Sequence, residues 1–190
     1  MNYLKQIKEY VPKTKEEIKD KEMILYMHSK IGDEILNRSS LACHMSSSGL
    51  VVNHDFSKIL MIYHNIYKSW SWTGGHADGE EDLFSVALRE VEEETGAKDL
   101  KEISKDIISL EVLPVKSHIK RGEVVSNHLH MNVTYVFIGN EQEKLRIKED
   151  ENSGVKWIDV NRLDEFVSEK EMIPVYLKII KQAKEVMKLS

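Results

Sequence analysis

Residues 74–97 read GGHADGEEDLFSVALREVEEETGA and form the most informative segment of the chain. The segment opens with two glycines and an irregular polar loop, and it continues into residues that favour a helix from Asp82 to Thr95. Gly96 follows directly, and a residue without a Cβ suits the left-handed position just beyond a last helical turn. We therefore predict a loop followed by a helix that ends at Gly96.

The predicted helix carries three glutamates on one face. With an advance of 100° per residue, Glu90, Glu93 and Glu94 fall within an arc of about 100°, while Phe84 and Val91 lie on another side. Like charges at such spacings destabilise a helix by a few tenths of a kcal/mol per pair. A hard divalent cation would remove this repulsion, and Mg²⁺ leaves positions open for water and phosphate oxygens. The alternative is a solvated acidic face that binds nothing.

The spacing of the whole segment resembles the Nudix box, Gly-x5-Glu-x7-Arg-Glu-apolar-x-Glu-Glu-x-Gly-apolar, with every fixed position filled between Gly75 and Ala97. This resemblance implies an α/β/α sandwich with a mixed β-sheet, here with additional N-terminal and C-terminal helices. It also implies Mg²⁺-dependent hydrolysis of a diphosphate linkage in a nucleoside diphosphate derivative or related small molecule. Thr73, where proline often stands, and the small Ala97 depart from the usual pattern without removing a catalytic group.

The resemblance also implies roles for individual residues. Glu90, Glu93 and Glu94 look like the ligands of Mg²⁺, for which Mn²⁺ is the alternative ion. Glu90 is a candidate general base, and Arg89 with Glu81 resembles the pair that positions the loop against the helix.

The loop acids Glu149 and Glu151 leave the identity of the base open. Some family members place a further acid near the metal at this point of the chain, although a surface loop is the favoured interpretation of both residues. Cys43 is interpreted as an inert small residue that precedes the domain.

Candidate substrate-binding residues lie in two separate segments of the chain. Gly74 and Gly75 let a backbone approach a ligand closely, and His76 follows them in the same loop. His128 and His130 alternate with apolar residues and so share one face of a predicted strand. They either line a substrate pocket or face solvent; a Zn²⁺ site is less favoured because the sequence offers no obvious third ligand.

Other segments complete the expected fold. We expect helix within residues 3–36, a polar connection over 38–48, and paired strands at 50–52 and 59–63 around the turn residues Asn53, His54 and Asp55. Further strands are expected at 107–115, 129–138 and 155–158, and a last helix over 176–188. This order predicts an α/β protein with helices on both faces of the sheet, divided into an extension, 1–40, and a domain, 41–190.

Composition limits where the protein acts and what it binds. The 190 residues carry 32 acidic residues against 27 Lys and Arg, a net charge of -5, which disfavours broad binding of a nucleic acid polymer. The single cysteine, the charged start of the chain and the lack of a roughly 20-residue apolar run favour a soluble cytoplasmic protein without a membrane partner. A homodimer is left open.

Two other functions are compatible with the same fold. An enzyme resembling isopentenyl diphosphate isomerase would use a cysteine, and Cys43 is the sole thiol. A module that binds a nucleotide without catalysis would not need the complete set of box acids. The undamaged box favours hydrolysis over both.

Overall fold

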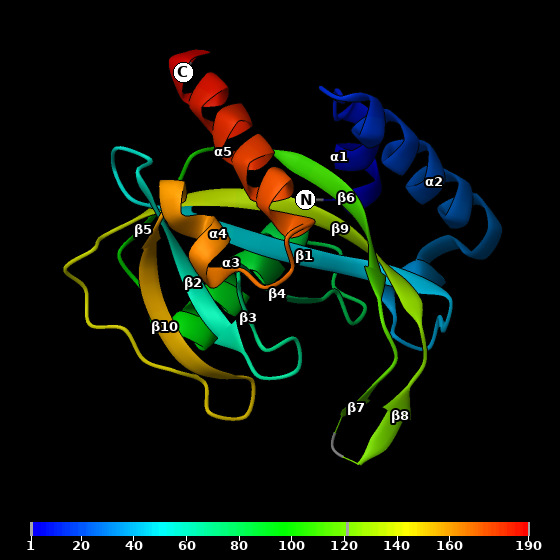
Figure 1. Ribbon diagram of the computed structural model, residues 1–190. Coiled ribbons are helices and arrows are strands. Elements are labelled where there is room, and N and C mark those ends of the chain that lie inside the picture. The colour runs from blue at the N-terminus through cyan, green and yellow to red at the C-terminus, as the bar shows by residue number, and fades with distance from the viewer. Residues whose placement is uncertain (1, 121, 190) are drawn as a thin grey trace.

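The structure, a computed structural model, describes residues 2–120 and 122–189 (Figure 1). In chain order the elements are α1 Tyr3–Glu9, α2 Lys15–Ile31, the 3-10 turn η1 Gly32–Leu36, β1 Cys43–Val52, β2 Lys58–His64, β3 Ser69–Ser71, β4 Thr73–His76, α3 Leu83–Thr95, β5 Leu100–Glu102, β6 Ser109–Val115, β7 His118–Lys120, β8 Glu123–Val125, β9 His128–Gly139, β10 Asn152–Asp159, the 3-10 turn η2 Val160–Arg162, α4 Leu163–Phe166 and α5 Met172–Leu189.

The centre of the molecule is a mixed sheet in which β1 and β9 run parallel. Its strand order is β10-β2-β1-β9-β5, and β3, β4 and β6 pair with β2, β1 and β9 respectively. All pairings other than β1 with β9 are antiparallel, including the predicted hairpin, in which Val51 faces Leu60. The strands β7 and β8 form a separate hairpin that extends from the body (Figure 1).

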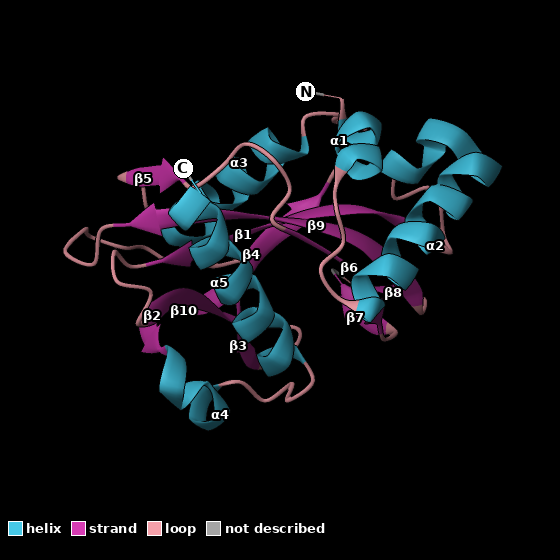
Figure 2. Cartoon of the chain, turned by 90° about the horizontal axis from the view of Figure 1, so that it is seen from above, coloured by secondary structure: helices cyan, strands magenta, loops and turns pink. Residues whose placement is uncertain are grey.

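Apolar side chains fill both faces of this sheet, as expected when strands alternate side chains between two covered faces. One core contains Met45, Val91 and Tyr135 and joins α1, α2 and α3 to the sheet. The other contains Leu50, Val136 and Ile179 and joins α4 and α5 to the opposite face. Figure 2 shows α3 on one side of the strands and α4 and α5 on the other. The predicted α/β/α sandwich is confirmed.

The N-terminal residues form two helices and a 3-10 turn. α1 ends before the segment that contains Pro12, a residue that lacks the amide proton a helix interior needs. Asn2 caps α1 by accepting from the Lys5 amide, and Thr14 caps α2 by accepting from the Glu17 amide. Because Ile7 and Ile24 are buried in the first core, these helices pack directly against the domain.

The interpretation of residues 38–48 as a connecting segment is wrong from Cys43 onward. β1 begins at Cys43, and all its residues are buried. Its serines tolerate this because each hydroxyl donates a hydrogen bond: Ser46 and Ser48 to Asn132 Oδ1 at 3.1 and 2.9 Å, and Ser47 to the Leu83 carbonyl at 2.6 Å. A polar sequence with internal partners thus forms a central strand.

Two predicted helices are present with small changes at their ends. α3 ends at Thr95, and Gly96 has φ 74°, the left-handed cap predicted for it. α5 begins at Met172, four positions before the expected start. Among the described residues, no helix combines the length and apolar character that crossing a membrane requires.

Candidate active site

A cleft of about 700 Å³ opens beside the three neighbouring strands β4, β1 and β9. Polar side chains and backbone form part of its wall, and Trp72 and Tyr176 form an aromatic part with their rings in edge contact, 5.3 Å between centroids. The cleft also contains most of the predicted site residues, namely Gly74, Gly75, His76, Glu90, Glu94, His128 and His130.

Three carboxylates converge at this cleft. Glu90 and Glu94 lie one turn apart on α3, and Glu151 precedes β10; each offers an oxygen, and these oxygens all lie within 4.8 Å of one another. The loop is fastened to the helix because the Asn152 side-chain amide donates to the Glu94 carbonyl at 3.0 Å. Glu151 thus lies in a partly exposed loop and also next to the acids of α3, whereas Glu149 is exposed as expected.

Burial and mutual repulsion disfavour full ionisation of these three carboxylates. Glu94 is only 2% exposed, and burial, followed by the charge of Glu90, raises its pKa to about 8, although the Gly74 amide donates to it at 3.1 Å. Burial also raises the pKa of Glu90. Buried carboxylates close together favour either protonation or a cation between them, and an all-oxygen donor set suits Mg²⁺. The residues present fit this ion.

Glu93 is exposed and is paired with a lysine. Lys148 Nζ is 2.9 Å from Glu93 and 3.1 Å from Glu151, so one ammonium bridges the two acids. Burial disfavours the charged ammonium, but hydrogen bonds from it to both acids raise the pKa of Lys148 overall. Of the three predicted ligands, the structure brings Glu90 and Glu94 together and holds Glu93 beside Lys148.

The adjacent glycines Gly74 and Gly75 have different structural roles. Gly74 supplies the amide that contacts Glu94, while Gly75 permits a close approach of β4 to α3. A Cβ at Gly75 would lie 2.3 Å from Glu90 Oε1, which is too short for any non-bonded contact. Glycine at this position therefore lets Glu90 reach the cleft.

The predicted positioning pair adopts a different arrangement. Glu81 is exposed and accepts a hydrogen bond from the Asn2 side chain at 2.9 Å. Arg89 is also exposed, and its positive charge lowers the pKa of Glu90 against the larger effect of burial. No ion pair joins Glu81 to Arg89 within residues 2–120 and 122–189.

The histidines predicted from the sequence are joined by a fourth that the prediction missed. His44 of β1, His76 of β4, and His128 and His130 of β9 bring four ring nitrogens within 4.8 Å of one another. The third ligand that the sequence did not offer is therefore present. The alternation of His44, Ser46 and Ser48 was the available signal, but it is recognisable only once residues 43–48 are known to form a strand.

Cys43 does not face this cleft. It is buried in the core shared with α3, and burial raises the pKa of its thiol. Its interpretation as an inert residue agrees with this environment, although it lies inside the sheet and not before it.

Comparison with known proteins places this geometry in a family. The model of the NUDIX domain matches residues 44–182, which is well over half of the chain. The chain belongs to the NUDIX domain family. The resemblance of residues 75–97 is confirmed by this match, and the predicted enzyme class agrees with relatives that are named hydrolases.

The NUDIX chain is similar to individual proteins at low to moderate identity. It is 35% identical over 109 residues to m7GpppN-mRNA hydrolase NUDT17 of Xenopus laevis, covering 54% of this chain and 34% of that protein. The chain thus spans about a third of that relative's length. An Ap4A hydrolase of C. elegans shares the fold, with a TM-score of 0.52, 15% identity, and coverage of 77% and 98% of the two chains.

A second solved structure has a similar extent of match. A NUDIX hydrolase of Clostridium perfringens is 20% identical with a TM-score of 0.49, and the match covers 77% of this chain and 97% of that one.

Proposed function

We propose that this NUDIX protein hydrolyses a diphosphate linkage in a nucleoside diphosphate derivative with the help of Mg²⁺. The observation that carries the proposal is the convergence of Glu90, Glu94 and Glu151 in a cleft beside Gly74 and Gly75. These carboxylates have raised pKa values at two of the three positions because they are buried. A site in which buried carboxylates lie close together without a cation is suited to bind a divalent cation together with phosphate.

The metal ligands in this proposal are Glu90, Glu93 and Glu94, with Glu151 as an additional acid. When bound, Mg²⁺ neutralises phosphate oxygens and lowers the pKa of water. A water oxygen forms a bond to phosphorus, the bridging P–O bond breaks, and Glu90 or Glu151 takes the proton of the water. The family resemblance assigns Glu81 and Arg89 the positioning of the box loop against α3, although in the structure Glu81 accepts from Asn2 instead, and Lys148 balances the charge of Glu93 and Glu151.

The cleft favours a substrate with a compact charged end and an aromatic part. Gly74 and Gly75 lie beside the carboxylates, and His76, in ring contact with His130, lines the same cleft together with His128. Trp72 is partly exposed and offers aromatic surface for a base, whereas Tyr176, which packs against its ring, is only 1% exposed. We propose a small-molecule substrate, and the names of the relatives add dinucleoside polyphosphates and capped RNA to the compounds to be tested.

The test is a turnover screen with and without Mg²⁺ or Mn²⁺. The panel contains nucleoside triphosphates, nucleotide sugars, dinucleotide cofactors, dinucleoside polyphosphates and capped RNA, and the readout is release of phosphate-containing products. Glu90→Gln should abolish turnover, whereas Glu149→Gln on the exposed loop should not change it. Tight binding of a compound without any turnover would instead favour a non-catalytic binding module.

Glu93 needs a separate test because it is paired with Lys148 in this structure. Glu93→Gln removes a ligand charge and keeps the shape, so we expect most turnover to be lost while the fold stays intact. Unchanged Mg²⁺-dependent activity in this variant would remove Glu93 from the ligand set.

The isomerase alternative depends on Cys43, which is buried in the core away from the cleft. Cys43→Ala should leave product release unchanged if hydrolysis is the function. Loss of an isomerisation activity in that variant would favour the alternative.

The remaining assignments concern the organisation and location of the protein. We propose that residues 1–40 are a helical extension of a domain over 41–190, because the family match begins at residue 44. A cytoplasmic location and a small-molecule partner are part of the same proposal, and a monomer or a homodimer is consistent with it. Gel filtration with light scattering decides the oligomeric state.

A further inference from the structure

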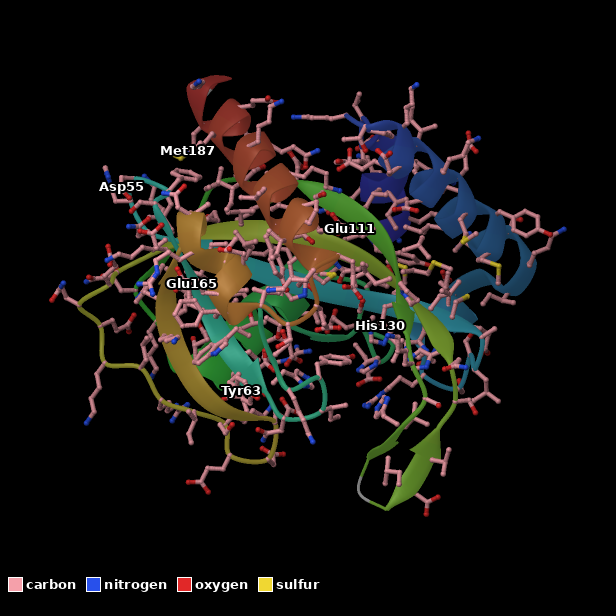
Figure 3. All side chains as sticks on the ribbon, in the orientation of Figure 1. Asp55, Tyr63, Glu111, His130, Glu165 and Met187 are labelled. Atoms are coloured by element: carbon pink, nitrogen blue, oxygen red, sulfur yellow. The ribbon has the colours of Figure 1, made fainter. Side chains whose placement is uncertain are left out.

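The cluster His44, His76, His128 and His130 lines the same cleft, and the hydrolytic step proposed above assigns it no chemical role. The four side chains come from three adjacent strands, with His44 directly beside His130 in the parallel pairing and His76 opposite Ser46. Five of the ring pairs have centroids between 4.7 and 5.2 Å apart. Figure 3 shows His130 near the base of the β7–β8 hairpin. The sheet therefore holds four imidazoles around one point.

Hydrogen bonds fix which ring nitrogens point into the cluster with a lone pair. His44 Nδ1 is 3.1 Å from the Ser40 carbonyl and His128 Nδ1 is 2.8 Å from the Ser126 carbonyl. A carbonyl only accepts, so both Nδ1 atoms carry the proton and both Nε2 atoms are acceptors, that of His128 accepting from His130 Nε2. A backbone carbonyl on the outer nitrogen is also the usual support of a metal-binding histidine.

One of these lone pairs has no partner in the described part of the chain. His44 is 5% exposed, and its Nε2 is buried without a hydrogen bond to any residue in 2–120 or 122–189. Buried polar atoms are nearly always satisfied, so an orphan atom indicates a missing partner. His128 Nε2 and His130 Nε2 are 3.2 Å apart, close to the spacing of about 3.3 Å between two nitrogens that bind one tetrahedral Zn²⁺ at about 2.0–2.1 Å.

Two of the four imidazoles, His44 and His130, are in surroundings that favour a cation over an anion. Burial lowers the pKa of His44, and burial followed by the neighbouring histidines lowers that of His130 to about 2. Neutral imidazoles do not attract phosphate, but they are the form in which histidine binds metals. Imidazole nitrogen suits Zn²⁺, Co²⁺, Ni²⁺ and Cu²⁺, whereas Mg²⁺ prefers oxygen.

We infer that His44, His76, His128 and His130 form a second metal site that binds a Zn²⁺-class ion with nitrogen ligands. This site is distinct from the carboxylate group and shares only the cleft with it. Because His76 follows Gly75, an ion bound here ties the end of β4 to β1 and β9. It thereby fixes the strand that carries Gly74 and Gly75.

The test measures metal binding directly and does not depend on any hydrolytic activity. The full chain, stripped with a chelator, is titrated with Zn²⁺ against a chromophoric competitor in excess Mg²⁺, and Co²⁺ is added in a parallel titration. We expect one Zn²⁺ per chain and the intense visible absorption of tetrahedral Co²⁺. His130→Gln and His44→Gln should each weaken Zn²⁺ binding at least tenfold.

Control variants separate this site from other histidines and from the carboxylates. His54→Gln changes an exposed histidine in the β1–β2 turn and should leave Zn²⁺ binding unchanged, as should Glu94→Gln. His128→Gln, at a half-buried position, replaces His44→Gln if circular dichroism shows that the latter fails to fold. Absent Zn²⁺ binding, or binding that survives His130→Gln and His128→Gln, overturns the inference whatever the outcome of the turnover screen.

Discussion

Two groups of buried acids in this protein have opposite environments. Glu17 of α2 and Glu111 of β6 are both almost fully buried, and Lys178 of α5 lies 3.1 and 3.0 Å from them. Ser109 and Gln182 add hydrogen bonds to the same Glu17 oxygen at 3.0 and 2.9 Å. Figure 3 places Glu111 beside α5, apart from His130. The cation for this first group is built into the fold.

The acids of the cleft are not balanced in the same way by the described residues. Glu94 is as buried as Glu111, yet its pKa is raised to about 8 by burial and by the charge of Glu90. Burial also acts on Glu17, but hydrogen bonds from Gln182 and the Lys13 amide, together with Lys178, lower its pKa overall. The difference shows that burial alone does not mark a functional acid; a buried acid without a cation does.

We expect the largest effect on stability from a substitution that removes the cation of the first group. Lys178→Met leaves two buried carboxylates without a counter-charge, and breaking such a pair costs about 3–5 kcal/mol. Urea unfolding measures the loss, and Lys181→Met, at an exposed position of the same helix, is the control. A loss below about 1 kcal/mol, typical of surface pairs, would show that the two groups are not as different as described.

A comparable substitution in the cleft should have the reverse pattern, with turnover lost and stability kept. Glu94→Gln should reduce turnover by about 10²- to 10³-fold, as the removal of one electrostatic contributor does in other enzymes. Its stability without metal should be equal to or above that of the unmodified protein, because a neutral amide removes the repulsion from Glu90. Steady-state kinetics and unfolding in chelator test both parts, and strong destabilisation would contradict the prediction.

The third prediction uses pH to separate the groups. Glu94 has a higher pKa in the folded protein than the ordinary 4.5. Its contribution to the free energy of unfolding is therefore fully present below pH 4.5 and is lost as pH rises toward 8. Glu17 has a lowered pKa, so its contribution is present above pH 4.5 and is lost as pH falls through the folded value. A tenfold difference in proton affinity between the folded and the unfolded chain corresponds to about 1.4 kcal/mol of stability.

The measurement compares variants in metal-free buffer across this range. Glu94→Gln should remove a decline of stability between about pH 5 and pH 8, and Glu17→Gln should remove a decline on the acid side. Excess Mg²⁺ should flatten the first slope, since the ion binds the ionised carboxylate. Identical slopes in the unmodified protein and Glu94→Gln would refute the raised pKa.

The smallest expected effect comes from a substitution beside Lys148, the lysine that lines the cleft. Glu151→Gln removes one partner of Lys148 and one oxygen ligand, and we expect a loss of about tenfold in apparent Mg²⁺ affinity with stability unchanged. Titration of activity with Mg²⁺ measures this change, with Glu149→Gln as the control. A Mg²⁺ affinity equal to that of the control would place Glu151 outside the site.

Local patterns in the sequence predicted the parts of the fold that depend on neighbouring residues. α3 and its cap at Gly96 follow from helical spacing, and the β1–β2 hairpin follows from its turn residues. The box also predicted Glu90 and Glu94 together, because one helical turn separates them.

Contacts between distant segments were not predictable in this way. The start of β1 reads as a polar connection because the partners of Ser46 and Ser48 lie at Asn132, far along the chain. Glu151 joins the acids only through the packing of its loop, and His44 meets His130 only through the parallel register. A single sequence does not specify these distances in space.

The parallel pairing of β1 with β9 has a consequence for folding during synthesis on the ribosome. Ten register pairs, from Cys43 with Leu129 to Val52 with Ile138, join segments that the ribosome makes far apart in time. Pairing over such a separation is slow, because a long loop must close before the contacts form. A nascent chain that stops before residue 128 has neither the complete histidine cluster nor one wall of the cleft, so both sites require that β9 has been made.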